Sequence, residues 1–250
     1  MTQITAARKL IWVQTKMSLR EPLGLFFTLL FAPLLLLMIG AIFGNDPVPE
    51  FGGQRHLDMR TPTYAAIVIG VVGLIGIPVE TVGRREMGAL RRFRATPLRP
   101  LTYIAADVFV NFIMVMLGIL LLFLVARLVF QVQFSGNIIL LLAGICLSTL
   151  AFLALGYLLA SLIPTVSAAT VVGNVLIIPM LFLSGITVPL ELMPEAVQNI
   201  ARFSPLTCVA TLLRGLWFDE PVSAYLFEIA ILGGVLIGAT LLAAWRFRWE

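Results

Sequence analysis

Six long apolar stretches set the strongest constraint on how this chain can fold. They cover roughly residues 23–43, 62–80, 104–126, 138–160, 168–189 and 223–244. A helix of roughly 20 apolar residues is long enough to cross the ~30 Å hydrocarbon core of a bilayer. Each stretch is apolar all round, and none shows the strict alternation expected of a β-barrel strand. We therefore expect an all-α integral membrane fold with six transmembrane helices in a single domain, residues 1–250.

The composition agrees with a chain that lies mostly in lipid. Of its 250 residues, 60% are hydrophobic and only 12% are charged. Soluble domains are about 45–50% apolar and about 25% charged. A soluble fold could not keep this much apolar surface away from water, and a disordered chain would need more charge. Both classes are therefore excluded.

The basic residues predict the orientation of the chain. Twelve of the 17 lysines and arginines precede the first stretch, follow the second stretch or lie in the C-terminal tail: Arg8, Lys9, Lys16, Arg20, Arg84, Arg85, Arg91, Arg92, Arg94, Arg99, Arg246 and Arg248. Six crossings put these regions on one side, and basic residues gather on the cytoplasmic side. We expect both termini in the cytoplasm. Because topology explains the cations, the net charge of +4 predicts no nucleic-acid partner.

Residues 4–20 have the pattern of an amphipathic helix. On a helical wheel, one half is apolar apart from Gln14: Ile4, Ala6, Ala7, Leu10, Ile11, Val13 and Met17. The other half includes Arg8, Lys9, Trp12, Lys16 and Arg20. Such a helix would lie flat on the inner membrane surface with its cations at anionic head groups. An ordinary basic tail is the alternative.

The segment 82–97 is the most informative loop. It contains Arg84, Arg85, Glu86, Met87, Gly88, Leu90, Arg91, Arg92 and Phe93. Met87, Leu90 and Phe93 would share one face of a short helix that ends before Pro97. An apolar ridge on a basic loop facing water is a candidate docking surface for a soluble partner. A loop whose cations only set topology is the alternative.

Two short helices are expected between the fifth and sixth stretches, within 190–217. Ser184-Gly185 and Pro189 would break the fifth crossing, and a first helix would run from Pro194 to Phe203. Pro205 is well placed to begin the second. This second helix carries an apolar stripe: Leu206, Val209, Ala210 and Leu213. The pair would form a re-entrant hairpin or an outer cap, or else lie at the interface without a special role.

The residues needed for chemistry are missing. Neither Lys9 nor Lys16 follows a glycine, so the chain has no P-loop, and His56 is its single histidine. The sequence therefore predicts no catalytic residue, no metal site and no cofactor on this chain. The ionisable residues Glu80 and Asp107 fall near the ends of crossings, where they can pair. If the chain is a transporter, the lack of an ATP site and of coupling charges inside the membrane predicts that another subunit supplies the energy.

Two motifs resemble the permease subunit of a type-2 ABC exporter, a likeness that covers essentially the whole chain. The first runs Arg85-Glu86-Met87-Gly88-Ala89-Leu90-Arg91-Arg92-Phe93 and continues to Ala95-Thr96-Pro97. The second joins Ser184-Gly185, Pro189 and Pro194 to Ser204-Pro205-Leu206-Thr207 and Leu213-Arg214-Gly215. Cys208 departs from the family, in which an aromatic residue is frequent at this position.

The resemblance implies roles for these segments. Residues 4–20 would be an elbow helix, 82–97 a coupling helix seated on the ATPase, and 190–217 re-entrant helices near an outer gate. It implies two ATPase subunits that bind ATP and Mg²⁺, and a second copy or a sister permease, in a bacterial-type plasma (inner) membrane. The candidate substrate path would be lined by Phe27, Phe31, Asn174 and Phe182.

Several functions remain open at this stage. Export of a hydrophobic drug- or antibiotic-like molecule is preferred because the loops are too short to form a polysaccharide-binding domain. Export of a lipid-linked polysaccharide or cell-wall glycan is the first alternative. An ATP-independent channel or secondary carrier, or a scaffold without transport, is the alternative from another class.

Overall fold

The computed structural model describes residues 3–44, 55–88, 100–185 and 193–246, and every regular element among them is a helix. The elements are α1 (Gln3–Ser18), α2 (Pro22–Leu25), η1 (Phe26–Leu30), α3 (Phe31–Phe43), α4 (His56–Val71), η3 (Val72–Gly76), α5 (Ile77–Glu86), α7 (Pro100–Phe130), α8 (Ile138–Leu162), α9 (Val166–Leu183), α10 (Glu195–Ala201), α11 (Pro205–Trp217), η5 (Val222–Tyr225) and α12 (Leu226–Arg246). The predicted all-α class is confirmed for these residues.

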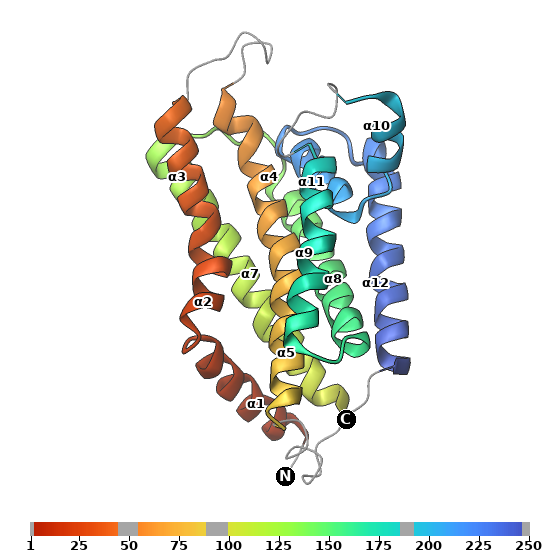
Figure 1. Cartoon of the computed structure of the whole chain (residues 1–250). Helices are drawn as coiled ribbons and strands as arrows, with labels where there is room; N and C mark the ends of the chain where they lie inside the picture. Colours follow the sequence, from red (N-terminus) through yellow and green to blue (C-terminus); the bar gives the residue numbers. More distant parts are fainter. Residues whose placement is uncertain (1–2, 45–54, 89–99, 186–192, 247–250) are drawn as a thin grey trace.

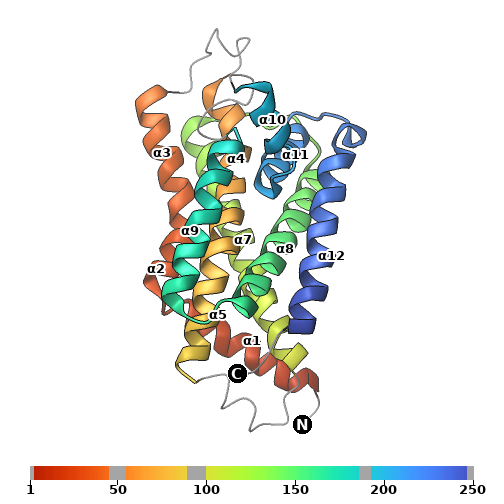
Figure 2. The same ribbon diagram turned by 45° about the vertical axis from the view of Figure 1, so that its right-hand side comes forward.

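The long helices run up and down in one bundle (Figure 1). We call the lower end in that view, where α1 and the last turns of α5 and α12 lie, the terminal end of the bundle. The opposite end is the distal end, where α10 and α11 lie between α9 and α12 (Figure 2). Helix α1 does not join the bundle lengthwise but lies across its terminal end.

Five helical segments in the described part of the chain are long and apolar enough to cross a membrane: His56–Glu86, Thr102–Phe130, Ile138–Leu162, Val166–Leu183 and Val222–Trp245. These five coincide with predicted crossings. Phe26–Ile42, in the first predicted crossing, is a shorter apolar helix. The first crossing, predicted over 23–43, therefore stays a prediction.

The ends of several crossings differ from the sequence prediction. The helix predicted over 104–126 extends from Pro100 to Phe130, because its polar first turns pack against α1 and α5 instead of ending at the apolar core. The helix predicted over 168–189 ends earlier, at Leu183. Gly185 follows with a φ of +75°, a conformation that glycine adopts readily and that terminates helices. Residues 186–192 lie outside the described part.

Two π-helical segments, η1 and η3, each lie shortly before a proline, Pro33 and Pro78. Proline lacks an N–H and clashes with the carbonyl four residues earlier. For Pro33 and Pro78 those carbonyls belong to Leu29 and Leu74, inside η1 and η3. The wider turns are closed by bonds spanning five residues, such as Ile77 N–H to the Val72 carbonyl. The chain accommodates these prolines by widening a turn, and it keeps the helix continuous.

The helix formed by α4, η3 and α5 is the centre of the bundle. Residues 61–70 are buried without exception. Helices α3, α7, α8, α9 and α11 all pack against this central helix. Its most closely packed neighbours approach through glycines: a Cβ on Gly156 of α8 would lie 2.3 Å from the Gly73 carbonyl oxygen, and one on Gly173 of α9 would lie 2.6 Å from that of Leu74.

The second crossing carries three glycines at spacings of three residues, Gly70, Gly73 and Gly76, and other helices approach two of them closely. A Cβ on Gly70 would meet Leu206 Cδ1 at 2.9 Å, and one on Gly73 would meet Phe152 Cβ at 2.7 Å. Gly76 is exposed and faces no other helix within 4 Å. Small residues let two of these three positions bring helices close together, as they commonly do in membranes.

The two short helices expected within 190–217 are present as α10 and α11. Leu206, Val209, Ala210 and Leu213 of the predicted stripe are all buried. Burial extends well beyond that stripe, to Thr207 and Trp217, because α11 inserts among α4, α8, α9 and α12. Helix α11 is thus an internal element of the distal end.

Replacing Gly156 by alanine should destabilise the bundle, because its new methyl group would collide with the Gly73 carbonyl oxygen. Overpacking of this kind costs about 1–3 kcal/mol. We expect G156A to lower the thermal unfolding midpoint in detergent. The matched control is G233A in α12, where a Cβ meets nothing within 4 Å and the same gain in helix propensity applies. Equal midpoints for the two variants would contradict the close approach.

Candidate functional site

Helix α1 packs on the first turns of α7. Leu10 is buried against Tyr103 and Ala106, and Gln14, also buried, lies one turn further along. The residues predicted for the membrane surface are exposed: Arg8, Lys9, Trp12, Lys16 and Arg20. Lys16 Nζ lies 5.0 Å from the centre of the Trp12 ring.

The buried face of α1 differs from the one predicted. Val13 and Met17, expected on the apolar half, are 44% and 41% exposed, whereas the polar Gln14 is 3% exposed. The prediction assumed that the bilayer is the only apolar surrounding of this helix. One face of α1 instead contacts α7, and this leaves Val13 and Met17 on a different face, available to a second apolar surface.

Arg84 lies in a buried cluster of ionisable groups. Its Nη1 donates to Asp107 Oδ1 at 2.6 Å and to the Tyr103 hydroxyl at 3.2 Å, and its Nη2 bonds to Glu80. The Tyr157 hydroxyl donates to the other oxygen of Asp107 at 2.5 Å. Arg84 and Asp107 are 5% and 2% exposed. Because these bonds join α5, α7 and α8, the cluster fixes three helices to one another.

This interior position of Arg84 differs from the sequence prediction, which grouped the residue with an exposed docking loop. The reason is that α7 begins early, at Pro100, and brings Asp107 beside the last turn of α5. The i,i+4 spacing of Glu80 and Arg84 was visible in the sequence. The third helix, and therefore the burial, was not.

Arg85 and Glu86 bind the turn between α8 and α9. Arg85 Nη1 donates to the Ala160 carbonyl at 3.2 Å and its Nη2 to the Ile163 carbonyl, both at the end of α8. Glu86 Oε1 accepts from the Val166 N–H at 3.1 Å, at the start of α9. A cation thus meets the negative end of one helix dipole and a carboxylate the positive end of the next. Both side chains satisfy backbone groups that helix ends leave free.

Helix α5 ends directly after these residues. Met87 is 74% exposed, and Gly88, with a φ of +67°, ends α5. The remaining residues predicted for the docking segment, Leu90, Arg91, Arg92 and Phe93, lie outside the described part. Their arrangement on one helical face stays a prediction.

The four predicted path residues lie on two helices that flank the central one. Phe27 and Phe31 are on η1 and α3, with ring centres 5.5 Å apart. Asn174 and Phe182 are exposed on α9, and the Asn174 amide donates to the Thr170 carbonyl of its own helix. Both η1–α3 and α9 pack against the α4–η3–α5 helix. The two pairs therefore lie on different segments that each pack on the central helix.

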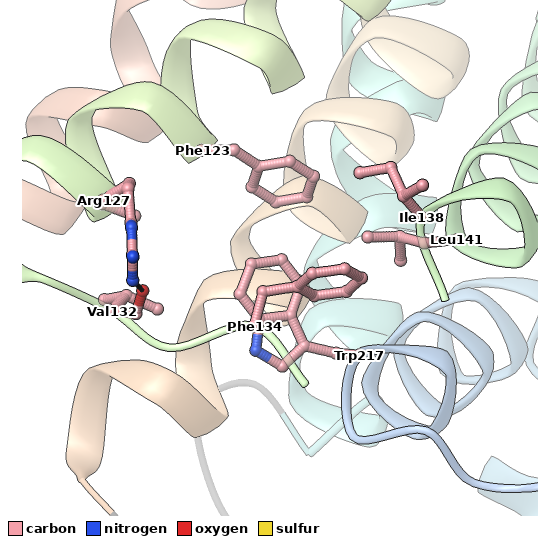
Figure 3. Close-up of a pocket in the computed structure, with 8 residues that line it drawn as sticks. Phe123, Arg127, Val132, Phe134, Ile138, Leu141 and Trp217 are labelled. Carbon is pink, nitrogen blue, oxygen red and sulfur yellow. Dashed lines mark hydrogen bonds between the residues drawn. The ribbon is translucent and has the colours of Figure 1, made fainter. Parts of the chain in front are cut away.

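A small apolar pocket lies between the end of α7, the start of α8 and the end of α11 (Figure 3). It has a volume of about 170 Å³, and its lining is Phe123, Ala126, Arg127, Val132, Phe134, Ile138, Leu141 and Trp217. The ring centres of Phe123 and Phe134 each lie 5.0 Å from that of Trp217. Arg127 turns towards Val132 and donates to its carbonyl. The pocket can hold an apolar ring or a short alkyl group.

Sequence reasoning missed this pocket because three helices and a linker contribute to it. Trp217 Nε1 donates to the Gln133 carbonyl at 3.2 Å, which fixes the indole over the linker. None of the predicted path residues belongs to its lining. The pocket and the cluster around Arg84 are separate features, since they lie at opposite ends of α7.

Replacing Arg84 by methionine should destabilise the protein strongly. The change leaves the buried carboxylates of Glu80 and Asp107 without their cation, and breaking a buried ion pair in this way costs about 3–5 kcal/mol. D107N should lower the free energy of unfolding less, because Arg84 then still has its ion pair with Glu80. We expect R84M/D107N to recover part of the loss of R84M in thermal unfolding. An R84M protein as stable as the wild type would contradict the buried pair.

Comparison with known proteins supplies the family. The chain is 28% identical over 204 residues to the inner membrane transport permease YhhJ of Escherichia coli (strain K12), which is 79% of this chain and 51% of that protein. It is 34% identical over 88 residues to nodulation protein J of Rhizobium leguminosarum bv. viciae, 35% of this chain and 34% of that protein. The chain thus spans about half the length or less of these relatives. The ABC-2 type transporter family matches residues 5–218. The chain belongs to the ABC-2 type transporter family.

Proposed function

We propose that this chain is the membrane-spanning permease subunit of an ATP-driven ABC exporter. The observation that carries the proposal is the family match over 5–218, together with five helices in the described residues that are long enough to cross a membrane. The sequence has no P-loop, so ATP and Mg²⁺ would be bound by two separate ATPase subunits. The whole complex would hydrolyse ATP, and this chain would supply the path.

The proposed topology has six crossings with both termini in the cytoplasm. Helices α2, η1 and α3 follow one another without a break from Pro22 to Phe43, which supports a first crossing that includes all three. The basic residues before and after the first two crossings support a cytoplasmic terminal end. Helix α1 would lie on the inner surface as the elbow helix, with the exposed Trp12 and Lys16 at the head groups.

The proposed docking surface for the ATPases begins at Met87. Its exposed side chain, together with Leu90 and Phe93, would form the apolar ridge, and Arg91 and Arg92 would flank it. Three preceding residues anchor this segment to three helices, so a partner seated on it would act on the bundle as a whole. Rigid-body motion of a docked subunit is a common way to switch a transporter between states.

The path would lie between this chain and a second permease, identical or related. Helix α9 is little buried and presents the exposed Asn174 and Phe182, and the exposed Phe27 lies on η1. Such an apolar surface with one amide suits a hydrophobic drug- or antibiotic-like substrate. Export of a lipid-linked polysaccharide or cell-wall glycan is the alternative within the same architecture.

An ATP-independent channel or carrier is the second candidate function. The observation that favours it is the buried cluster of Glu80, Arg84 and Asp107, since proton-driven carriers use ionisable groups inside the membrane. The pairing of both carboxylates with one arginine favours a fixed structural role instead. Movement of substrate in vesicles driven by a proton gradient without ATP would support the carrier.

The docking surface is tested by co-purification with the ATPase subunit. We expect L90D and F93D each to reduce the ATPase recovered with the permease at least about tenfold, because a charge replaces an apolar contact at the centre of an interface. The matched control is L19D, which changes an exposed leucine at the end of α1. Unchanged recovery with both docking variants would overturn the role of this surface.

A further inference from the structure

Arg85 and Glu86 stand at the point where the proposed docking segment joins the bundle, yet both side chains bind the α8–α9 turn of their own chain. We infer that Arg85 and Glu86 are positioning residues that couple α9 to the docking segment. In this view they do not contact the ATPase. The inference rests on the proposed function in one respect, namely that the segment after Met87 seats the ATPase.

The turn that these residues hold is short and leaves little freedom. Helix α8 ends at Leu162 and α9 begins at Val166, so residues 163–165 connect them. Arg85 donates to two carbonyls on the α8 side, and Glu86 accepts from the first N–H of α9. The Thr165 hydroxyl accepts from the Ala168 N–H and completes the start of α9. A displacement of the end of α5 is therefore applied directly to the first turn of α9.

An apolar cluster lies beside these bonds. Val82 of α5 is fully buried with Ala160, Ile163 and Ala169, and the partly buried Val166 packs on the same cluster. Burial of this kind keeps water from competing along the α5 side of the contact. The cluster and the polar contacts together make α5 and the start of α9 one unit.

The contact between α9 and the central helix continues further along. Gly173 brings α9 so close that a Cβ there would lie 2.6 Å from the Leu74 carbonyl oxygen. The opposite face of α9 is free, with Val175, Ile178 and Phe182 all at least half exposed. A helix held on one face at two levels, and open on the other, transfers motion from the terminal end to the open face.

Arg84 and the pair Arg85–Glu86 have different surroundings, which separates their roles. Arg84 is enclosed by two carboxylates and a tyrosine, so its loss should damage the fold. Glu86 is exposed and Arg85 is half-buried, and each side chain hydrogen-bonds to a backbone group of the α8–α9 turn. Variants of these two residues should therefore fold and keep the ATPase bound, while α9 loses its link to the docking segment.

Hydrogen exchange of the assembled complex tests the inference without a known substrate. The permease–ATPase complex is compared with and without Mg²⁺ and a non-hydrolysable ATP analogue, for peptides covering 89–99 and 163–172. In the wild type we expect nucleotide to change exchange in both regions. In R85A/E86A the change at 89–99 should persist, and the change at 163–172 should fall at least threefold.

Matched variants separate positioning from simple loss of structure. E86Q keeps an oxygen acceptor for the Val166 N–H and should retain most of the wild-type response. E195A/R202A removes one exposed acid and one exposed arginine at the distal end and should behave as wild type. If the R85A/E86A permease itself does not fold, E86A alone is measured against E86Q.

The outcomes distinguish this inference from the proposed function. A nucleotide response at 163–172 that survives in R85A/E86A, or in E86A, overturns the positioning role. A wild-type complex that shows no nucleotide response at 89–99, or a permease that recovers no ATPase, instead overturns the proposed function. Loss of the ATPase from R85A/E86A but not from E195A/R202A would return these residues to the docking surface.

Discussion

The burial of one guanidinium between two carboxylates is the interaction on which the terminal end of this protein depends. Arg84 cannot leave its cluster without exposing Asp107 and Glu80 to an interior that does not solvate them. Because Asp107 is on α7 and is also bonded by Tyr157 of α8, the cluster determines where three helices meet. The arrangement of the neighbouring residues follows from it. With Arg84 fixed, the next two side chains along α5 point to α8 and α9.

The distal end is built on a different principle. It has the apolar helix α11 inserted among its neighbours, and the rings of Phe123 and Phe134 packed at steep angles against Trp217. The middle of the bundle depends on glycines, which let α8 and α9 pack directly against backbone carbonyl groups of the central helix. Polar bonds therefore dominate where the backbone of helix ends is free, and close packing dominates where helices only pass one another.

Much of the fold could be predicted from the sequence, because long apolar runs report helices and crossings directly. The helices α10 and α11 were also within reach, since Pro205 and the Leu206 stripe are local signals. The partners of a side chain are not local signals. The prediction placed Arg84 on a loop surface and Gln14 on the bilayer side of α1, whereas α7 covers the first and packs beside the second. The pocket at Trp217 is likewise invisible in a single sequence.

The π-helical segment in the central helix has a consequence for how the two halves of that helix face. A π turn contains about one residue more than an α turn, so the side chains beyond it are rotated by about 100° relative to an unbroken helix. The direction in which Arg84, Arg85 and Glu86 point is therefore a result of η3, which ends eight residues before Arg84 towards the distal end. Pro78 stabilises that wide turn, and it therefore sets the rotation of the α5 side chains at the terminal end.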